Sequence, residues 1–81
     1  MSEVERRLFR VYGFESTHDA LTAEAVLRDA GVATTVMPTP RELGELCGIA
    51  LRVAVEEAGD AEAAMRARAV VWRATMELLD R

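Results

Sequence analysis

The sequence contains one cysteine, Cys47, whose thiol is the strongest nucleophile that the chain offers. A thiol attacks and accepts in its thiolate form, which a nearby cation can stabilise and a base can generate. Arg41 supplies a cation on the same predicted turn, and His18, the single histidine, supplies a base or hydrogen-bond partner. Reactive thiol chemistry at Cys47 is therefore one interpretation of these residue types. No complete catalytic set accompanies them, so we expect a protein that is not an enzyme.

The same residues also have purely structural interpretations. A free cysteine is often a small buried packing residue, and a histidine in the first turn of a helix can simply face solvent. A metal site is a third interpretation, but Cys47 and His18 cannot complete a tetrahedral shell without a second chain. For a single chain the sequence therefore predicts neither a metal nor another cofactor.

Length and composition predict one small domain spanning residues 1–81, with a flexible N-terminal tail at residues 1–6. The hydrophobic share is 51%, but aromatic residues make up only 5%, which predicts a thin aliphatic core. A domain of this size has a narrow stability margin. We therefore expect a homo-oligomer.

The charge pattern argues against nucleic acid and membranes as partners. The net charge is −4, every basic residue is an arginine, and no basic stripe is present to neutralise phosphates. The N-terminal M-S-E-V-E-R-R is followed by no apolar signal or anchor segment. Together with the unpaired thiol, this predicts a cytoplasmic protein.

Strand and helix patterns alternate in the first half of the chain. Residues 7–14 mix β-branched and aromatic types and predict a strand. Ser16 and Asp19 form a capping-box-like start for a helix that runs to about Ala30, and Gly31 ends it. Residues 32–38 predict a second strand, which Pro38 closes.

The segment that carries Cys47 is predicted to be a short helical turn over residues 40–46. Thr39 is the expected N-cap, and Pro40 occupies the first helical position. Gly48 is expected to end the turn, which places Cys47 at its C-terminal cap. A thiolate is disfavoured there by the negative end of the helix dipole. Activation would have to come from Arg41, His18, a partner, or Arg52 in the next strand.

The second half predicts one strand and one long helix. Residues 49–55 alternate strictly, which places Arg52 with Ala50 and Ala54 on one face. Asp60 is the expected N-cap of a helix whose apolar repeat continues to Leu79. The fold class is α+β, a split β-α-β with a ferredoxin-like sheet of three strands and both helices on one face. The last strand lies antiparallel between the first two, and the face that carries Arg52 is uncovered.

Two further charged residues are interpreted as structural. Glu24 precedes Arg28 by one helical turn and forms an i,i+4 pair with it. Arg68 falls on the apolar side of the predicted second helix, where it either extends its head group to the edge or pairs with Glu24.

Three segments resemble the putative Se/S carrier protein-like family. Residues 14–24 contain its phenylalanine, S-T-H-D-A and glutamate, residues 38–43 its P-x-P-R-E, and residues 47–52 its C-G. The order and spacing of the three carry the resemblance, which covers roughly residues 9–55. It implies a small protein that holds sulfur or selenium on Cys47 in a persulfide-like state, between donor and acceptor proteins. The residues expected to shape the pocket are Arg41, His18, Pro40 and Gly48.

The alternative function belongs to another class. In it the chain is a protein–protein interaction or regulatory module that pairs through its uncovered sheet face, and Cys47 is a packing residue. Arg52 would then be the residue that matters for the partner.

Overall fold

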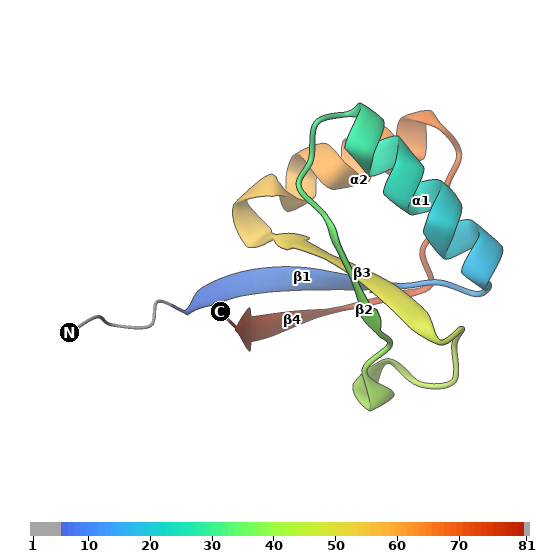
Figure 1. Ribbon diagram of the computed structural model, residues 1–81, viewed down its shortest axis with the longest axis vertical. Helices are drawn as coiled ribbons and strands as arrows, with labels where there is room; N and C mark the ends of the chain where they lie inside the picture. Colours follow the sequence, from blue (N-terminus) through green and yellow to red (C-terminus); the bar gives the residue numbers. More distant parts are fainter. Residues whose placement is uncertain (1–5, 81) are drawn as a thin grey trace.

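The computed structural model describes residues 6–80, and the predicted tail at residues 1–6 falls outside them except for Arg6. Four strands form one sheet with the order β2-β3-β1-β4, in which every neighbouring pair is antiparallel (Figure 1). Two helices lie together over one face of this sheet. In chain order the elements are β1 (Arg7–Gly13), α1 (Thr17–Asp29), β2 (Thr35–Pro38), the 3-10 turn η1 (Arg41–Leu43), β3 (Ile49–Ala54), the 3-10 turn η2 (Val55–Glu57), α2 (Ala58–Ala67) and β4 (Ala74–Asp80).

The α+β class is confirmed, as are the two helices on one face and the insertion of β3 between β1 and β2. The three-stranded sheet was wrong, because residues 74–80 form a fourth strand rather than the end of the second helix. This strand pairs with the outer edge of β1 over its full length, from Arg7↔Asp80 to Gly13↔Ala74. The pairing satisfies a row of β1 backbone groups that a three-stranded sheet would leave open.

The start of α1 follows the prediction. Ser16 is its N-cap, and the Ser16 hydroxyl accepts a hydrogen bond of 3.0 Å from the Asp19 N–H. In contrast, α2 begins at Ala58, so Asp60 lies in its first turn and is not its N-cap. It ends at Ala67. Two residues later, Ala69 takes a positive φ of 61° and turns the chain back toward the sheet.

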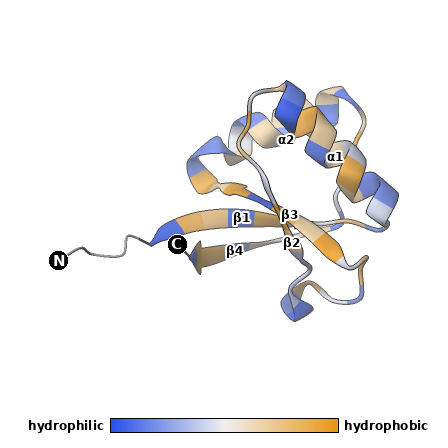
Figure 2. Ribbon diagram, viewed as in Figure 1, coloured by the Kyte–Doolittle hydropathy of each residue, from blue (hydrophilic) through white to orange (hydrophobic). Residues whose placement is uncertain are grey.

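The core lies between the helices and the sheet. Alternation turns Tyr12 of β1, Phe14 just after β1, and Leu51 and Val53 of β3 toward the helices. The helices contribute mainly small residues, which brings them close to the sheet. In Figure 2 the ribbon of β3 is mostly hydrophobic, η1 is hydrophilic, and the helices carry residues of both kinds. The helical members of the core are Ala20, Ala23, Val26, Leu27, Ala58, Ala61 and Met65.

The opposite face of the sheet carries no helix, and Arg52 lies on it as predicted. Its guanidinium lies 4.1 Å from the centroid of the Phe9 ring and donates a 2.8 Å hydrogen bond to Asp80 of β4. Under this arm Phe9 and Val11 are buried, with exposed fractions of 8% and 0%. The open face is therefore partly covered by its own side chains.

Candidate functional site

Cys47 lies in the segment 39–48, which joins β2 to β3 beyond the pair Pro38↔Ile49. The segment extends from the sheet on the side away from the helices (Figure 1). Only Arg41–Leu43 are helical, and the turn ends at Gly44, whose φ is 88°. The predicted turn over residues 40–46 with Gly48 as its stop was therefore wrong. Cys47 is not at a helix C-terminus, and the expected dipole penalty on a thiolate does not apply.

The prediction that Thr39 is the N-cap of the turn was wrong. The N-cap position belongs to Pro40, which has no side-chain capping bond. The Thr39 hydroxyl instead donates a 2.7 Å hydrogen bond to the carbonyl of Cys47. The Thr39 N–H donates to the carbonyl of Gly48 at 3.1 Å. Thr39 thereby ties the start of the segment to its end.

The backbone of Cys47 is also tied to β1. Its N–H donates a 3.1 Å hydrogen bond to the carbonyl of Phe14. Phe14 immediately follows β1 and lies two residues before the N-cap Ser16. The contact brings the cysteine beside the chain that leads into α1, so two distant stretches of sequence meet at this point.

The Cys47 thiol is partly buried and packs against the edge of the core. Its Sγ donates a hydrogen bond of 3.2 Å to the carbonyl of Ile49. Only the protonated sulfur can donate this bond. The thiol is therefore held in a defined orientation that it must leave before it reacts as a thiolate.

Two leucines of the segment rest on Gly13. A Cβ added at Gly13 would lie 2.6 Å from Leu46 Cδ1 and 3.0 Å from Leu43 Cδ1, so the leucines occupy the space of the missing side chain. By alternation Gly13 faces the open side of the sheet, whereas Cys47 packs against the core on the helix side. The segment thus wraps around one end of the sheet and contacts both faces.

Three of the other predicted site residues, Arg41, Pro40 and Gly48, lie within the segment itself, and His18 lies outside it in α1. Arg41 and Gly48 are exposed, and Pro40 is partly buried. His18 is exposed in the first turn of α1, the element that the Phe14 contact brings near. Among residues 6–80, neither the Arg41 nor the His18 side chain forms a hydrogen bond or ion pair with Cys47. Their part in the site stays a prediction.

Sequence reasoning missed a polar cluster between the sheet and α2. Glu62 accepts hydrogen bonds from the Tyr12 hydroxyl at 2.8 Å and from Arg10 at 3.0 Å, and Arg10 also donates to Glu77 at 2.7 Å. Burial opposes ionisation of Glu62, but the bonds from Tyr12 and Arg10 outweigh it and lower the pKa of this carboxyl. Burial and the bond to Glu62 raise the pKa of Tyr12. The partners are far apart in the chain, and the available signal was a tyrosine in an apolar strand, whose hydroxyl needs a partner.

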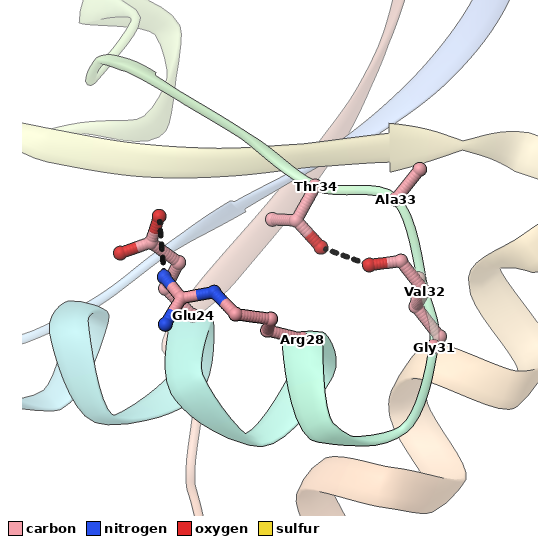
Figure 3. A pocket seen from close by; sticks show the side chains of 6 residues that line it. All are labelled: Glu24, Arg28, Gly31, Val32, Ala33 and Thr34. Carbon is pink, nitrogen blue, oxygen red and sulfur yellow. Dashed lines mark hydrogen bonds and ion pairs between the residues drawn. The ribbon is translucent and has the colours of Figure 1, made fainter.

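A shallow pocket of about 300 Å³ lies at the far end of α1 from Cys47 (Figure 3). Glu24 and Arg28 form the predicted i,i+4 pair beside it, at 3.4 Å. The Thr34 hydroxyl donates to the Val32 carbonyl at 3.0 Å, so this pocket wall is internally bonded. Arg68 is the C-cap residue of α2 and is exposed. The helix does not continue beyond it, so the longer apolar helix face on which the sequence analysis placed Arg68 does not form.

Residues 6–80 contain neither a membrane-spanning helix nor a cluster of metal-ligating side chains. Neither helix of residues 6–80 combines the length and apolar character that a membrane crossing requires. In the same residues no three side chains of His, Cys, Asp or Glu come together as metal ligands.

Comparison with known proteins decides the family. A family model described as "Putative Se/S carrier protein-like" matches residues 10–77. The chain belongs to this family. The match extends beyond the resemblance over residues 9–55 and takes in α2 and most of β4. No curated protein and no solved structure matches the chain.

Proposed function

We propose that this protein is a non-enzymatic carrier that holds one sulfur or selenium atom on Cys47 and passes it from a donor protein to an acceptor protein. The observation that supports the proposal most directly is the setting of the chain's only thiol. Family membership points to sulfur or selenium, and Cys47 is held by its backbone at the edge of the molecule with its side chain only partly covered. A reducing cytoplasm would keep this thiol unpaired and available.

The proposed transfer balances without an outside oxidant. The Cys47 thiolate attacks the terminal sulfur of a donor persulfide, the donor S–S bond breaks, and the donor leaves as a thiolate. Cys47 then carries the persulfide. Attack by an acceptor thiolate on the outer atom reverses these steps and returns Cys47 as a thiolate. Selenium follows the same path from a donor that carries it as a perselenide.

The neighbouring residues have proposed parts in this cycle. His18 accepts the thiol proton, and Arg41 compensates the charge of the persulfide, which is ionised more readily than a thiol. Both side chains are exposed, and the proposal requires that they turn toward a cargo on Cys47. Gly48 and Pro40 shape the backbone on either side. Arg52 is a weaker candidate, because its guanidinium is engaged with Phe9 and Asp80 on the open face.

Intact-protein mass spectrometry after incubation with a small persulfide donor tests the proposal. The wild-type chain is expected to gain the mass of one sulfur atom, which dithiothreitol removes. Cys47→Ser should gain nothing, and His18→Ala should load more slowly at neutral pH. A wild-type chain that remains unmodified while a reference thiol protein loads under the same conditions would contradict the carrier function.

A protein–protein interaction module is the second candidate function, and the packed, hydrogen-bonded Cys47 side chain favours it. Cys47 packs against the core and bonds to Ile49, as a structural residue does. In this case the chain pairs with a second copy through the open face that carries Arg52. Sedimentation velocity distinguishes the two functions: Arg52→Glu should convert a dimer to a monomer, whereas Cys47→Ala should leave the dimer intact. A wild-type chain that sediments as a monomer would exclude this candidate.

A further inference from the structure

The segment 39–48 has less internal support than the parts of the fold that carry the core. No residue from Thr39 to Ile49 is buried, as in the edge strand β2 before it, whereas β1, α1, α2 and the rest of β3 contribute buried residues. Its 3-10 turn has no buried residue and no side-chain cap. Segments with few buried contacts open locally at a lower free energy than global unfolding requires. The segment therefore has the properties of a separately opening unit.

Its attachments to the body are few and identifiable. Leu43 and Leu46 fill the space above Gly13, and the Cys47 N–H binds the Phe14 carbonyl at 3.1 Å. The remaining bonds from Thr39 close the segment on itself and need not break when it moves. The Cys47 side chain also packs against the core edge, and η1 lies beside β4. The two leucines resting on Gly13 are the contact that fills the space of its missing side chain, and we call them the leucine latch.

We propose that the segment 39–48 is a cover that opens as a unit, with the leucine latch on Gly13 setting how often the Cys47 thiol becomes reactive. Release of the latch lets the segment leave the end of the sheet, which withdraws Cys47 from the core edge. Gly13 is then a positioning residue for the thiol, since any side chain there competes with the latch.

This inference rests on the proposed function for its purpose, although not for its test. A carrier must keep its cargo atom from small thiols and expose it to the correct partner. A cover with a low opening free energy does both, because a docking protein can stabilise the open form by binding the freed leucines.

The test measures how fast iodoacetamide alkylates Cys47 in the folded full-length chain. Wild type is expected to react more slowly than the urea-unfolded chain, because reaction waits for opening. Leu46→Ala removes part of the latch and should raise the rate about tenfold, the effect of losing two or three partly buried methylene-sized groups. Gly13→Val pushes both leucines away and should raise it by a similar factor, while its β-branched side chain suits a strand.

The Ala69→Gly variant is the matched control. It changes the stability of the whole fold at a site outside the segment, so its alkylation rate should equal that of wild type. A slower rate in Ala69→Gly would show that Cys47 reacts only through global unfolding and would overturn the proposal. A wild-type thiol that reacts as fast as the unfolded chain would overturn it as well.

Combining Gly13→Ala with Leu46→Ala adds a second readout. Because both changes act on one shared space, the alanine methyl at Gly13 should accelerate alkylation less in the Leu46→Ala background than in wild type. Independent effects would contradict a latch. Alkylation needs no sulfur donor, so it tests the cover independently of the carrier function. The cover proposal can be contradicted while persulfide loading succeeds, and it can hold while loading fails. Circular dichroism confirms the fold of each variant, and Leu46→Ala alone decides the matter if Gly13→Val does not fold.

Discussion

The two helices end in the same hydrogen-bond pattern on different residues. After α1, the N–H groups of Gly31 and Val32 bind the carbonyls of Arg28 and Leu27 at 3.0 and 2.9 Å. After α2, Ala69 and Val70 bind Arg66 and Met65 in the same way, at 3.1 and 2.9 Å. Both ends are Schellman motifs, which require a left-handed residue. That residue is Gly31 with φ 78° in α1 and Ala69 with φ 61° in α2.

The two helix ends are therefore stabilised by different means: local conformational preference in α1 and tertiary contacts in α2. Glycine takes a positive φ at no steric cost, so Gly31 ends α1 by local preference alone. Alanine is strained there by roughly 1–2 kcal/mol, and contacts made further along the chain must compensate. Beyond Ala69, Trp72 packs edge-on against Tyr12 with centroids 5.5 Å apart, and the Arg73 N–H binds the Gly13 carbonyl at 2.8 Å.

Gly31→Val is expected to have the largest effect, because it would give both helix ends a strained residue. A β-branched side chain at φ 78° should lower the free energy of unfolding by about 2 kcal/mol. No heavy atom lies within 4 Å of the added Cβ, so the loss would be conformational and not a clash. Urea unfolding measures it. Gly59→Ala, in an equally open place but inside α2, is the control and should not destabilise the fold.

Ala69→Gly should make the two helix ends alike by placing a glycine, which is not strained at a positive φ, at the end of α2 as well. Relief of the strained φ is expected to raise the free energy of unfolding by about 0.5–1 kcal/mol, after the greater flexibility of glycine in the unfolded chain is subtracted. Thermal unfolding measures this as a higher midpoint. An unchanged or lower midpoint would mean that Ala69 is not strained and that the two ends are equivalent.

Glu62→Gln tests whether polar contacts to β1 hold α2 in place. The pKa of Glu62 is lowered from 4.5 in the folded state, so the unfolded chain takes up the proton first as the pH falls. The stability from this carboxylate is complete above about pH 4.5 and is lost as the pH falls through the folded pKa.

Glu62→Gln should therefore be less stable than wild type at pH 7, by less than about 1 kcal/mol, and the gap should narrow toward pH 3. Urea unfolding at several pH values measures this gap. Glu24→Gln, in the exposed pair of α1, is the matched control. If the stability gap to wild type narrowed equally in Glu62→Gln and Glu24→Gln, the contacts of Glu62 would not hold α2 more firmly than a surface ion pair holds α1.

The same contrast explains which elements could be predicted from the sequence. The strand at residues 7–14, α1 and β3 follow from alternation, a capping serine and a stop glycine, which are all local signals. The end of α2 has no such signal, because Ala69 is a favourable helix residue by type. In addition, Ala74 and Leu78 are four residues apart and fit a helix, whereas Ala74, Met76 and Leu78 also fit one face of a strand. Pairing with β1 decides between the two.

The candidate site shows the same division. The family could be inferred from the segments around residues 14–24, 38–43 and 47–52, whereas the role of Cys47 stays a prediction. The environment of the thiol could not be inferred, because the turn was expected to end at Gly48 and ends at Gly44. Gly48 precedes a strand, and its type alone does not reveal its φ.

By itself, the sequence determined the α+β class, the β-α-β-β order of the first three strands, the face that carries Arg52 and the family. Each depends on residue type and spacing within one element or one motif. Only the tertiary structure decided the fourth strand, the Glu62 cluster and the setting of Cys47. The physical reason is that each of these depends on contacts with β1: β4 pairs along it, Glu62 binds Tyr12, and the Cys47 segment rests on Gly13. Contacts between residues so distant in the chain leave no periodic trace in the sequence.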